Sequence, residues 1–479
     1  MKLNKTMMTD LYEITMAQTY FDDKAFDKIV YFDGFFRVLP LESGYAIMSG
    51  VDNIIDYIQN INFDNDDIEY LRSTNKFTED FLDYLSKFKF NGDVWIVPDG
   101  TVVFGNEILI TVRASLIEAQ IIETTILSYL NSCIKYTTAA RRLVEASNGK
   151  PIMEFGARRA DGPEAAVLAS KCAFIAGCVG TSNVMAGKIY DIPVMGTMAH
   201  SMISAEDEEY DAFMKYAKSF PDDANFLIDT YDTIKSGIVN SIKVTKDFLI
   251  PNGYRLKSVR IDSGDLSYLS KQVRKILDEE GMEDTKIVLS NSIDPYTLTS
   301  LLVQNAKFDS VGAGDNIVAP KARVGVVYKL VAIEENQEIV PRIKISNEAL
   351  KIVNPGYKKL YRFYDKETGY ALGDVMALHD EVIPSEEFTL IDPLNEFNTT
   401  TITNYTFKEL QVPLFINGKL VYEDPDIREK QKYCNSQMAS MYPEVKRLEY
   451  PHKYYVDQTQ RLIDLKKDLI LEHKKQFEG

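Results

Sequence analysis

Two adjacent arginines follow an apolar run of the chain, an arrangement that suits an anionic ligand. Arg158 and Arg159 come shortly after Pro151–Phe155, in a segment that also contains two glycines. Guanidinium groups on such a backbone are suited to bidentate binding of a carboxylate or a phosphate. The alternative is a solvated turn in which the arginines pair with Asp161 and Glu164, and the residues alone leave both interpretations open.

A lone histidine follows the apolar run Val194–Gly196, within the hexapeptide GTMAHS that ends at Ser201. His200 is the only histidine before His379, so a metal site there would need carboxylates as its other ligands. Acid–base or nucleophilic chemistry is therefore the favoured functional interpretation. The alternative is a structural histidine with satisfied hydrogen bonds, which is the commoner role of an isolated histidine.

Carboxylates end two further apolar runs. Asp229 ends one, and Asp262 ends the next and is followed by Ser263, Gly264 and Asp265. Carboxylates that meet at one mouth could bind ribose hydroxyls or Mg²⁺. Ser263 or Asp265 could equally be the N-cap of the next helix. The two roles are compatible, because a capped helix N-terminus also favours a phosphate.

A glycine-containing loop ends the last apolar run. Gly312 and Gly314 flank Ala313 and precede Asp315. Such glycines let backbone amides approach a phosphate, as the final loops of barrel enzymes often do. A tight turn is the alternative explanation, and the carboxylate of Asp315 is an unfavourable neighbour for a phosphate.

The apolar runs belong to a repeating pattern between residues 150 and 330, where they alternate with helix-length segments such as Leu266–Glu280. The runs are Pro151–Phe155, Val194–Gly196, Phe226–Asp229, Val259–Asp262, Ile287–Leu289 and Phe308–Gly312. Repeated βα units predict a parallel sheet, closed as a barrel rather than open. Residues that follow the strands of such a barrel meet at one mouth, which is the usual place for its chemistry.

The segments on either side have other patterns. Residues 51–90 have helical spacing, residues 92–114 indicate a small β module, and a long helix is predicted over about 117–147. Further on, Leu360–Tyr364 and Tyr370–Val375 flank a hairpin turn.

The C-terminal part carries a second hairpin signal at Asn417-Gly418 and a charged, helical pattern over residues 424–479. We therefore expect an N-terminal helical and β-rich domain at 1–135 and an α/β barrel at 136–335. A C-terminal hairpin and helical region at 336–479 is expected to pack on the N-terminal domain.

The composition is that of a soluble globular protein. The 479 residues contain 54 Lys and Arg against 71 Asp and Glu, a net charge of −17. This charge argues against binding to nucleic acid or to an anionic membrane. The four cysteines form no CxxC pair, which predicts reduced thiols. No apolar run approaches the roughly 20 residues of a membrane span, and the N-terminus lacks a secretory signal, so a cytoplasmic protein is expected.

Together these segments resemble the nicotinate phosphoribosyltransferase family. The match runs in order from about residue 6 to 380, and its motifs are jointly specific. They are Thr9–Gln18, Phe35–Arg37, Gly156–Arg159, Gly180–Asn183, Gly196–Ser201 and Asp262–Leu266. The resemblance implies the type II phosphoribosyltransferase fold, an irregular parallel α/β barrel with a second, β-rich domain built from flanking segments.

The resemblance also implies an activity in NAD biosynthesis. In that family nicotinate and 5-phosphoribosyl 1-pyrophosphate (PRPP) give nicotinate mononucleotide and pyrophosphate, with Mg²⁺ and coupled ATP hydrolysis. The histidine that matches His200 is transiently phosphorylated by ATP, which makes the family's members ATP-coupled enzymes of the ligase class. A phosphorylated imidazole adds negative charge beside the pocket.

Carried over by position, the ring pocket would contain Tyr12, Thr197 and Arg260. Tyr12 would stack on the pyridine ring, and Arg260 would meet the nicotinate carboxylate with Thr197 close by. In the family this tyrosine comes from the other subunit of a homodimer, so shared active sites are expected. Arg158 and Arg159 match arginines at the substrate mouth. We assign Arg158 to nicotinate and Arg159 to PRPP.

The remaining matches concern PRPP and Mg²⁺. Asp229 and Asp262 match the acids near the ribose and the metal, which is not expected to be tightly bound. The other residues assigned to PRPP are Ser263, Gly264, Asp265, Gly312 and Gly314. The family often has Gly-Thr where this chain has Gly314-Asp315, so backbone contact with phosphate is favoured there over side-chain contact.

Two other functions remain open. A nicotinamide-specific relative would favour an acid in the ring pocket, and its opening motif has Ser-Tyr where this chain has Leu11-Tyr12. A catalytically inactive barrel that only binds nucleotides is the other possibility, and the presence of His200, Asp262 and both arginines argues against it.

Overall fold

The computed structural model describes residues 4–346, 348 and 351–478, and the chain divides into two compact units. The central unit is Tyr136–Lys321, and the flanking unit combines Met1–Lys135 with Ala322–Gly479. Helix α6 (Glu123–Ala146) contains the boundary between them. The flanking unit is therefore assembled from both ends of the chain.

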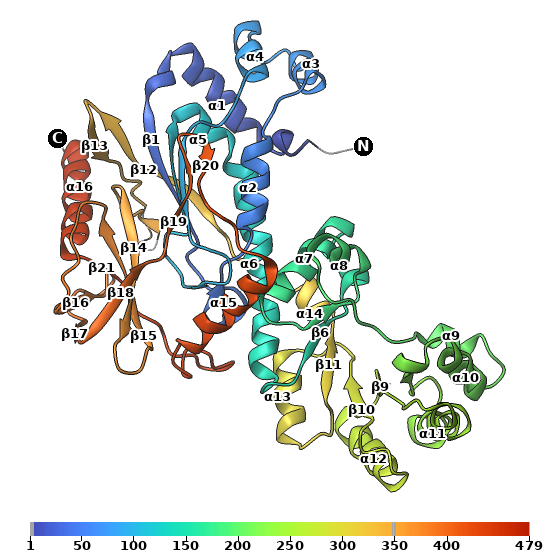
Figure 1. Ribbon diagram of the computed structural model, residues 1–479. Helices are drawn as coiled ribbons and strands as arrows, with labels where there is room; N and C mark the ends of the chain where they lie inside the picture. The colour runs from blue at the N-terminus through green and yellow to red at the C-terminus, as the bar shows by residue number, and fades with distance from the viewer. Residues whose placement is uncertain (1–3, 347, 349–350, 479) are drawn as a thin grey trace. The chain divides into compact units, whose positions relative to one another are not determined.

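The central unit is built on a parallel sheet with the strand order β7-β6-β11-β10-β9-β8 (Figure 1). Its strands are β6 (Ile152–Glu154), β7 (Gly180–Thr181), β8 (Asn225–Leu227), β9 (Ser258–Ile261), β10 (Lys286–Leu289) and β11 (Ser310–Ala313). Its helices are α7 (Pro163–Ile175), α8 (Val184–Tyr190), α9 (His200–Ser204), α10 (Glu209–Ser219), α11 (Ile238–Val244), α12 (Leu266–Glu279), α13 (Pro295–Val303) and α14 (Asp315–Val318).

Most of the predicted βα pattern is confirmed, with one strand wrong and one missed. The run Val194–Gly196 is not a strand, since it contributes only an isolated parallel bridge between Val194 and Thr181. This run is three residues long, follows Pro193 and ends in a glycine, which leaves little backbone for a ladder. Strand β7 was missed because it has two residues and no apolar alternation. The sheet forms a half-barrel within the described residues, rather than the closed barrel expected.

Strand β9 shows how this sheet separates core residues from site residues. Val259 and Ile261 are fully buried, whereas Arg260 between them is only partly buried. Side chains alternate between the two faces of a strand, so Arg260 points away from the apolar layer that its neighbours join. After β9, the amphipathic segment predicted at Leu266–Glu280 is confirmed as α12, which buries Val273 and Leu277.

Within the described residues, the flanking unit contains two larger, mainly antiparallel sheets and two strand pairs. The seven-stranded sheet consists of β13 (Glu338–Pro341), β12 (Val327–Glu335), β1 (Ile29–Phe35), β5 (Ile110–Ser115), β3 (Asp93–Ile96), β19 (Val412–Ile416) and β20 (Lys419–Leu420), in that order. In the four-stranded sheet, β18 (Tyr405–Glu409), β14 (Lys358–Asp365) and β15 (Ala371–Leu378) are antiparallel, and β21 (Val456–Gln458) runs parallel to β15. The pairs are β2 (Ala46–Ile47) with β4 (Val102–Val103), and β16 (Glu387–Ile391) with β17 (Thr399–Thr403).

The flanking unit also contains helices, of which α5 packs against β1 and β5 and α16 packs against β15 (Figure 1). They are α1 (Leu11–Asp22), α2 (Val51–Asn60), α3 (Asn65–Ser73), α4 (Glu79–Ser86), α5 (Leu116–Ile121), α15 (Ile427–Ala439) and α16 (Gln460–Glu478). The expected helical pattern at 51–90 and the β module at 92–114 are confirmed. The long helix expected over 117–147 is interrupted at Ile122, between α5 and α6.

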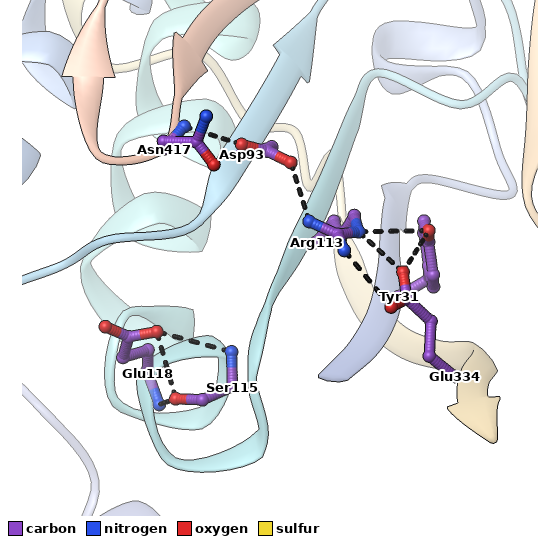
Figure 2. Close-up of polar contacts among 7 residues, drawn as sticks. All are labelled: Tyr31, Asp93, Arg113, Ser115, Glu118, Glu334 and Asn417. Atoms are coloured by element: carbon purple, nitrogen blue, oxygen red, sulfur yellow. Dashed lines mark hydrogen bonds and ion pairs between the residues drawn. The ribbon is translucent and has the colours of Figure 1, made fainter. Parts of the chain in front are cut away.

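Arg113 on β5 connects four strands of the seven-stranded sheet through its side chain (Figure 2). Its guanidinium donates to Asp93 on β3 at 3.0 Å and to Glu334 on β12 at 2.7 Å. It also donates to the Tyr31 hydroxyl on β1 at 3.1 Å, and Asp93 accepts from the backbone N–H of Asn417 at 2.7 Å. These charge-assisted bonds fix β1, β3 and β12 relative to β5 on the face that carries Arg113.

The predicted hairpins of the C-terminal half are confirmed. Strands β14 and β15 pair antiparallel, with Tyr361 opposite Val375. The turn between β19 and β20 places Asn417 and Gly418 at positive φ, 49° and 71°. Two successive positive φ values belong to the type I′ turn that an Asn-Gly pair favours.

Two further expectations concern cysteines and membranes. All four cysteines are buried, and none of them forms a disulfide. In the part of the chain that the structure describes, no helix is long and apolar enough to cross a bilayer.

A buried ion pair lies in the four-stranded sheet. Arg362 on β14 donates to Asp374 on β15 with its Nε at 2.7 Å, and neither side chain is exposed to solvent. The Tyr454 hydroxyl donates to the same carboxylate at 2.9 Å. A guanidinium keeps its charge, so the free energy of burying Arg362 depends on the carboxylate of Asp374.

We expect Asp374→Asn to destabilise the flanking unit by about 3–5 kcal/mol, because it leaves a buried guanidinium without its counterion. Urea unfolding followed by the fluorescence of Trp95, the chain's only tryptophan, would measure the change. Asp380→Asn is the control, since Asp380 pairs with Arg461 at 2.8 Å while both remain about half exposed. It should cost less than about 1 kcal/mol. Equal losses in the two variants would contradict the prediction.

Candidate active site

A cavity of about 390 Å³ opens at the carboxyl ends of the parallel strands. Its walls come from the loops after β6, β7, β9, β10 and β11 and from the segment before α9. The lining residues are Phe155, Ala157, Arg158, Arg159, Ser182, Gly196, Thr197, Met198, Ala199, Arg260, Asp262, Ser290, Asn291, Ser292, Gly312, Gly314 and Asp315. This is the edge of the sheet at which the sequence predicted that polar residues would meet.

Arg260 provides a partly desolvated positive charge on the cavity wall. Its Nη1 donates to the Thr197 hydroxyl at 2.6 Å, and its Nη2 lies 3.8 Å from Asp262. Burial lowers the pKa of Arg260, against the opposing effect of Asp262 and Asp229. Its buried Nε has no hydrogen-bond partner. The guanidinium therefore retains donor capacity for an anionic group in the cavity.

Two carboxylates lie beside that guanidinium, and each is held by groups that follow a strand. Asp229 is only 1% exposed, and its Oδ2 accepts from the Ser263 hydroxyl at 2.5 Å and from the Asp262 backbone N–H at 3.1 Å. The other oxygen of Asp229, Oδ1, is buried without a hydrogen-bond partner. Asp262 accepts from the Ser290 hydroxyl at 2.5 Å. An unpartnered buried carboxylate oxygen is suited to a hydroxyl donor or a cation.

His200 connects to both acids. Its Nε2 lies 3.9 Å from Asp262 and 4.0 Å from Asp229, and its Nδ1 is 3.0 Å from the Thr230 hydroxyl. The side chain is 43% exposed, so one ring edge remains accessible from solvent. The structure therefore brings His200, Arg260 and both carboxylates together, as the sequence predicted.

The paired arginines lie at the same cavity. Arg158 and Arg159 both line it, and Arg159 forms an ion pair with Asp315 at 3.6 Å. That pair explains how Asp315 can occupy a loop beside basic residues. It differs from the alternative in which the arginines pair with Asp161 and Glu164.

Close packing explains why positions 312 and 314 are occupied by glycine. A Cβ at Gly312 would lie 2.4 Å from the Phe155 ring, and one at Gly314 would lie 3.1 Å from the Phe155 carbonyl oxygen. Larger residues would push the loop after β6 away from β11. Both glycines line the cavity, so their backbone is also exposed to any ligand there.

The segment after Asp262 has a local structural role. Asp265 is the N-cap of α12 and accepts from the Tyr268 backbone N–H at 2.9 Å. Gly264 has a φ of 75°, a conformation that favours glycine. Neither residue lines the cavity, whereas Ser263 reaches the site through its bond to Asp229. Of the two N-cap candidates, Asp265 is the one confirmed.

Tyr12 belongs to the flanking unit and lies at the second position of α1. It is 46% exposed. Burial raises the pKa of its phenol, with further contributions from Glu123 and Glu13. Its ring is therefore available on the surface of the flanking unit.

Four residues that line the cavity or hold its catalytic candidates were not predicted from the sequence: Ser290, Asn291, Ser292 and Thr230. Ser182, which also lines the cavity, belongs to the motif Gly180–Asn183, to which no role was assigned. The three residues at 290–292 directly follow the predicted strand Ile287–Leu289, so the rule applied to the other strand ends would have found them. Thr230 carried no signal of its own, since its role appears only when α9 brings His200 beside it.

A divalent cation could be held by few protein ligands here. Among the described residues there is no group of three or more His, Cys, Asp or Glu side chains placed to hold a metal. The unpartnered Oδ1 of Asp229 and the nearby Asp262 fit Mg²⁺, which commonly binds one or two carboxylates together with substrate phosphates.

Comparison with known proteins identifies the family. Models of the nicotinate phosphoribosyltransferase N-terminal domain, family and C-terminal domain match residues 7–131, 151–341 and 357–466. A nicotinate phosphoribosyltransferase of Bacillus subtilis (strain 168) is 39% identical over 99% of this chain and 96% of its own length. The chain belongs to the nicotinate phosphoribosyltransferase family.

A more distant relative and a solved structure agree with this family membership. A nicotinate phosphoribosyltransferase of Caenorhabditis elegans is 33% identical over 98% of this chain and 94% of its own length. The crystal structure of human nicotinic acid phosphoribosyltransferase superposes with a TM-score of 0.86 at 26% identity, covering 96% of this chain and 99% of that one. The fold class expected from the sequence, a parallel α/β barrel with a β-rich domain from flanking segments, is confirmed in its half-barrel form.

The N-cap role of Asp265 can be tested separately from the effect of its negative charge. Asp265→Ala should lower the stability of the protein by about 1 kcal/mol, because α12 loses the acceptor for its first turn. Asp265→Asn keeps a side-chain oxygen and should restore most of that loss. Calorimetric unfolding would compare the two variants. If Asp265→Asn is as unstable as Asp265→Ala, the carboxylate charge rather than the cap is what matters.

Proposed function

We propose that this protein is a nicotinate phosphoribosyltransferase of NAD biosynthesis, which converts nicotinate and PRPP to nicotinate mononucleotide and pyrophosphate. The observation that carries the proposal is the guanidinium of Arg260, which is bonded to Thr197 and lines a cavity together with Asp262. Asp229 is buried directly behind Asp262. A positive group for the acid and negative groups for a developing sugar cation thus lie at one cavity.

The nicotinate carboxylate pairs with Arg260, beside the Thr197 hydroxyl. Arg158 adds a second positive charge near this position, since it contributes to lowering the Arg260 pKa. A neutral amide would gain less from these cations, so the arrangement favours nicotinate over nicotinamide.

The sugar donor lies toward the acids and the last loop. Asp229, Asp262 and Ser263 hold the ribose hydroxyls and Mg²⁺, with Gly264 and Asp265 behind them. Arg159 and the backbone at Gly312 and Gly314 receive phosphate oxygens. Mg²⁺, when bound, supplies charge neutralisation for the pyrophosphate oxygens.

The chemical step requires positioning more than proton transfer. The pyridine nitrogen forms a bond to C1 of the ribose while the bond from C1 to the pyrophosphate oxygen breaks. Because the transition state resembles an oxocarbenium ion, the carboxylates stabilise it and the arginines hold the departing group. The ring nitrogen is the nucleophile, so no protein base is needed.

ATP coupling is proposed to act through His200. Its half-exposed ring can accept the γ-phosphoryl group of ATP, with ADP as the leaving group, and water later cleaves the phosphohistidine. The contact between Nδ1 and Thr230 supports this role because it orients the ring so that Nε2 faces the acids. Added negative charge at that position changes how the cavity holds phosphates and Mg²⁺.

A homodimer completes the site in this proposal. Tyr12, exposed on the flanking unit, stacks on the pyridine ring bound by a second copy of the chain. Aromatic stacking on one ring face and a cation at the carboxylate would fix the orientation of a flat acid.

Arg260→Ala should lower kcat/KM for nicotinate by about 2–5 kcal/mol in transition-state free energy, because a buried charge partner is lost. Steady-state assay of mononucleotide formation would measure the loss, with nicotinamide assayed in parallel. Arg255→Ala is the control, since Arg255 is an exposed arginine paired with Asp284 at 3.3 Å. An unchanged KM for nicotinate, or equal turnover of nicotinamide by the unmodified protein, would reject the assignment.

His200→Ala should abolish acid-labile phosphoenzyme formed from γ-labelled ATP. It should leave some ATP-independent product formation, because the histidine does not take part in the glycosidic step. His473→Ala, which changes a histidine on α16, should retain the label. Undiminished labelling of His200→Ala would move the phosphorylation site to another residue.

A further inference from the structure

The flanking unit contains a second cavity, of about 420 Å³, which none of the proposed catalytic residues lines. Residues of β15, β21 and α16 contribute to its walls, together with the loops around Leu39, Leu394 and Pro451. A volume of this size can enclose a small organic molecule. The C-terminal part of the chain, for which the proposed reaction gives no role, thus forms most of a ligand-sized cavity.

Lys466 on α16 brings an uncompensated positive charge into this cavity. Its Nζ donates to the amide oxygen of Asn354 at 2.8 Å, and no carboxylate of the described residues lies within ion-pairing distance of it. The neighbouring Lys358 is neutralised by Asp33 at 2.9 Å. Burial, with a smaller effect of Lys358, lowers the pKa of Lys466 to about 8. An anion at this position would remove the cost of holding the charge there.

The charge of the rest of the lining is also positive. Arg37 and Lys453 line the cavity with Lys466, and Asp392 is the single carboxylate among the lining residues that the structure describes. Asp392 is 3.4 Å from Lys453, so its charge is already matched. The cavity is therefore basic within a protein whose net charge is −17.

The interior offers apolar surface and one free acceptor. Met376 and Phe104 are buried in its wall, and the Tyr454 ring stacks on Phe104 with centroids 3.9 Å apart. Gln458 also lines the cavity, is 2% exposed, and its Oε1 has no hydrogen-bond partner. A buried acceptor without a donor costs free energy unless a ligand or water satisfies it.

We propose that this cavity binds a small organic anion of up to mononucleotide size. Its phosphate or carboxylate pairs with Lys466, its flat or apolar part lies against Met376 and Tyr454, and an N–H or O–H group donates to Gln458. This site is separate from the proposed catalytic cavity, because the two share no lining residue. The inference therefore does not depend on the proposed reaction.

Calorimetric titration of the full chain with adenosine monophosphate, benzoate and inorganic phosphate tests the site. The Arg260→Ala background is used, so that binding in the catalytic cavity is weakened. We expect Lys466→Met to weaken the binding of adenosine monophosphate or benzoate about tenfold or more. Lys467→Met is the matched control, since Lys467 is the next residue of α16, pairs with Glu396 and lies outside the cavity. It should leave the affinity unchanged.

Each outcome decides a part of the proposal. Dependence of adenosine monophosphate binding on Lys466 supports a phosphate-bearing ligand, and dependence of benzoate binding supports a carboxylate-bearing one. No binding of either compound at millimolar concentration, or equal binding to Lys466→Met, would overturn the site. Inorganic phosphate that binds as tightly as both organic anions would overturn the role of the apolar wall.

A measurement on the protein without a Lys466 substitution avoids any folding defect of the variant. Limited acetylation, mapped by mass spectrometry, compares the labelling rates of Lys466 and Lys467 with and without adenosine monophosphate or benzoate. Bound anion should slow labelling of Lys466 several-fold and leave Lys467 unchanged. Unprotected Lys466 in the presence of a bound compound would place the anion elsewhere and overturn the proposal.

Discussion

The positive charge of Arg260, held in a partly buried position, is the constraint on which the candidate active site depends. Removing a guanidinium from water is costly unless nearby groups compensate it, and here the compensation is incomplete. Thr197 accepts one hydrogen bond, whereas Asp262 lies 3.8 Å away and the buried Nε has no partner. The uncompensated part of this positive charge favours the binding of an anion in the cavity. In a chain with a net charge of −17, such local positive charge does not arise from the average composition.

The acids that face Arg260 are held in turn by the architecture of the sheet. Asp229 and Asp262 follow neighbouring parallel strands, so the backbone N–H of one lies within reach of the carboxylate of the other at 3.1 Å. Ser263 and Ser290, which also follow strands, donate to these carboxylates. Each carboxylate is therefore fixed by a residue from the same edge of the sheet. Short strands suffice for this purpose, because the site needs adjacent strand ends rather than long ladders.

Sequence patterns predicted the parts of this site that follow directly from strand ends. Asp229 and Asp262 each end an apolar run, and the residues after such runs meet at one edge. The role of Arg260 came instead from the family resemblance. The pattern failed at Val194–Gly196, where three residues beside a proline make a single bridge instead of a ladder. It gave no signal for Thr230, whose contact with His200 joins the loop after β8 to the start of α9. The assignment of Tyr12 depends on family resemblance alone, since nothing in its local sequence distinguishes it from other exposed tyrosines.

Other buried cations of the chain provide a comparison for Arg260 and Lys466, whose charges are incompletely paired. Arg362, Lys358 and Lys430 each have a carboxylate within 3.0 Å, at Asp374, Asp33 and Asp99 respectively, and their charges are accounted for inside the protein. Arg260 has no carboxylate that close, and Lys466 has only the amide of Asn354. A fully paired buried charge gains little from a further ligand, whereas an incompletely paired one gains more. Among these five cations, the difference separates the three that are paired inside the protein from the two that line a ligand-sized cavity. Arg260 and Lys466 each line one of the two cavities for which we propose ligands.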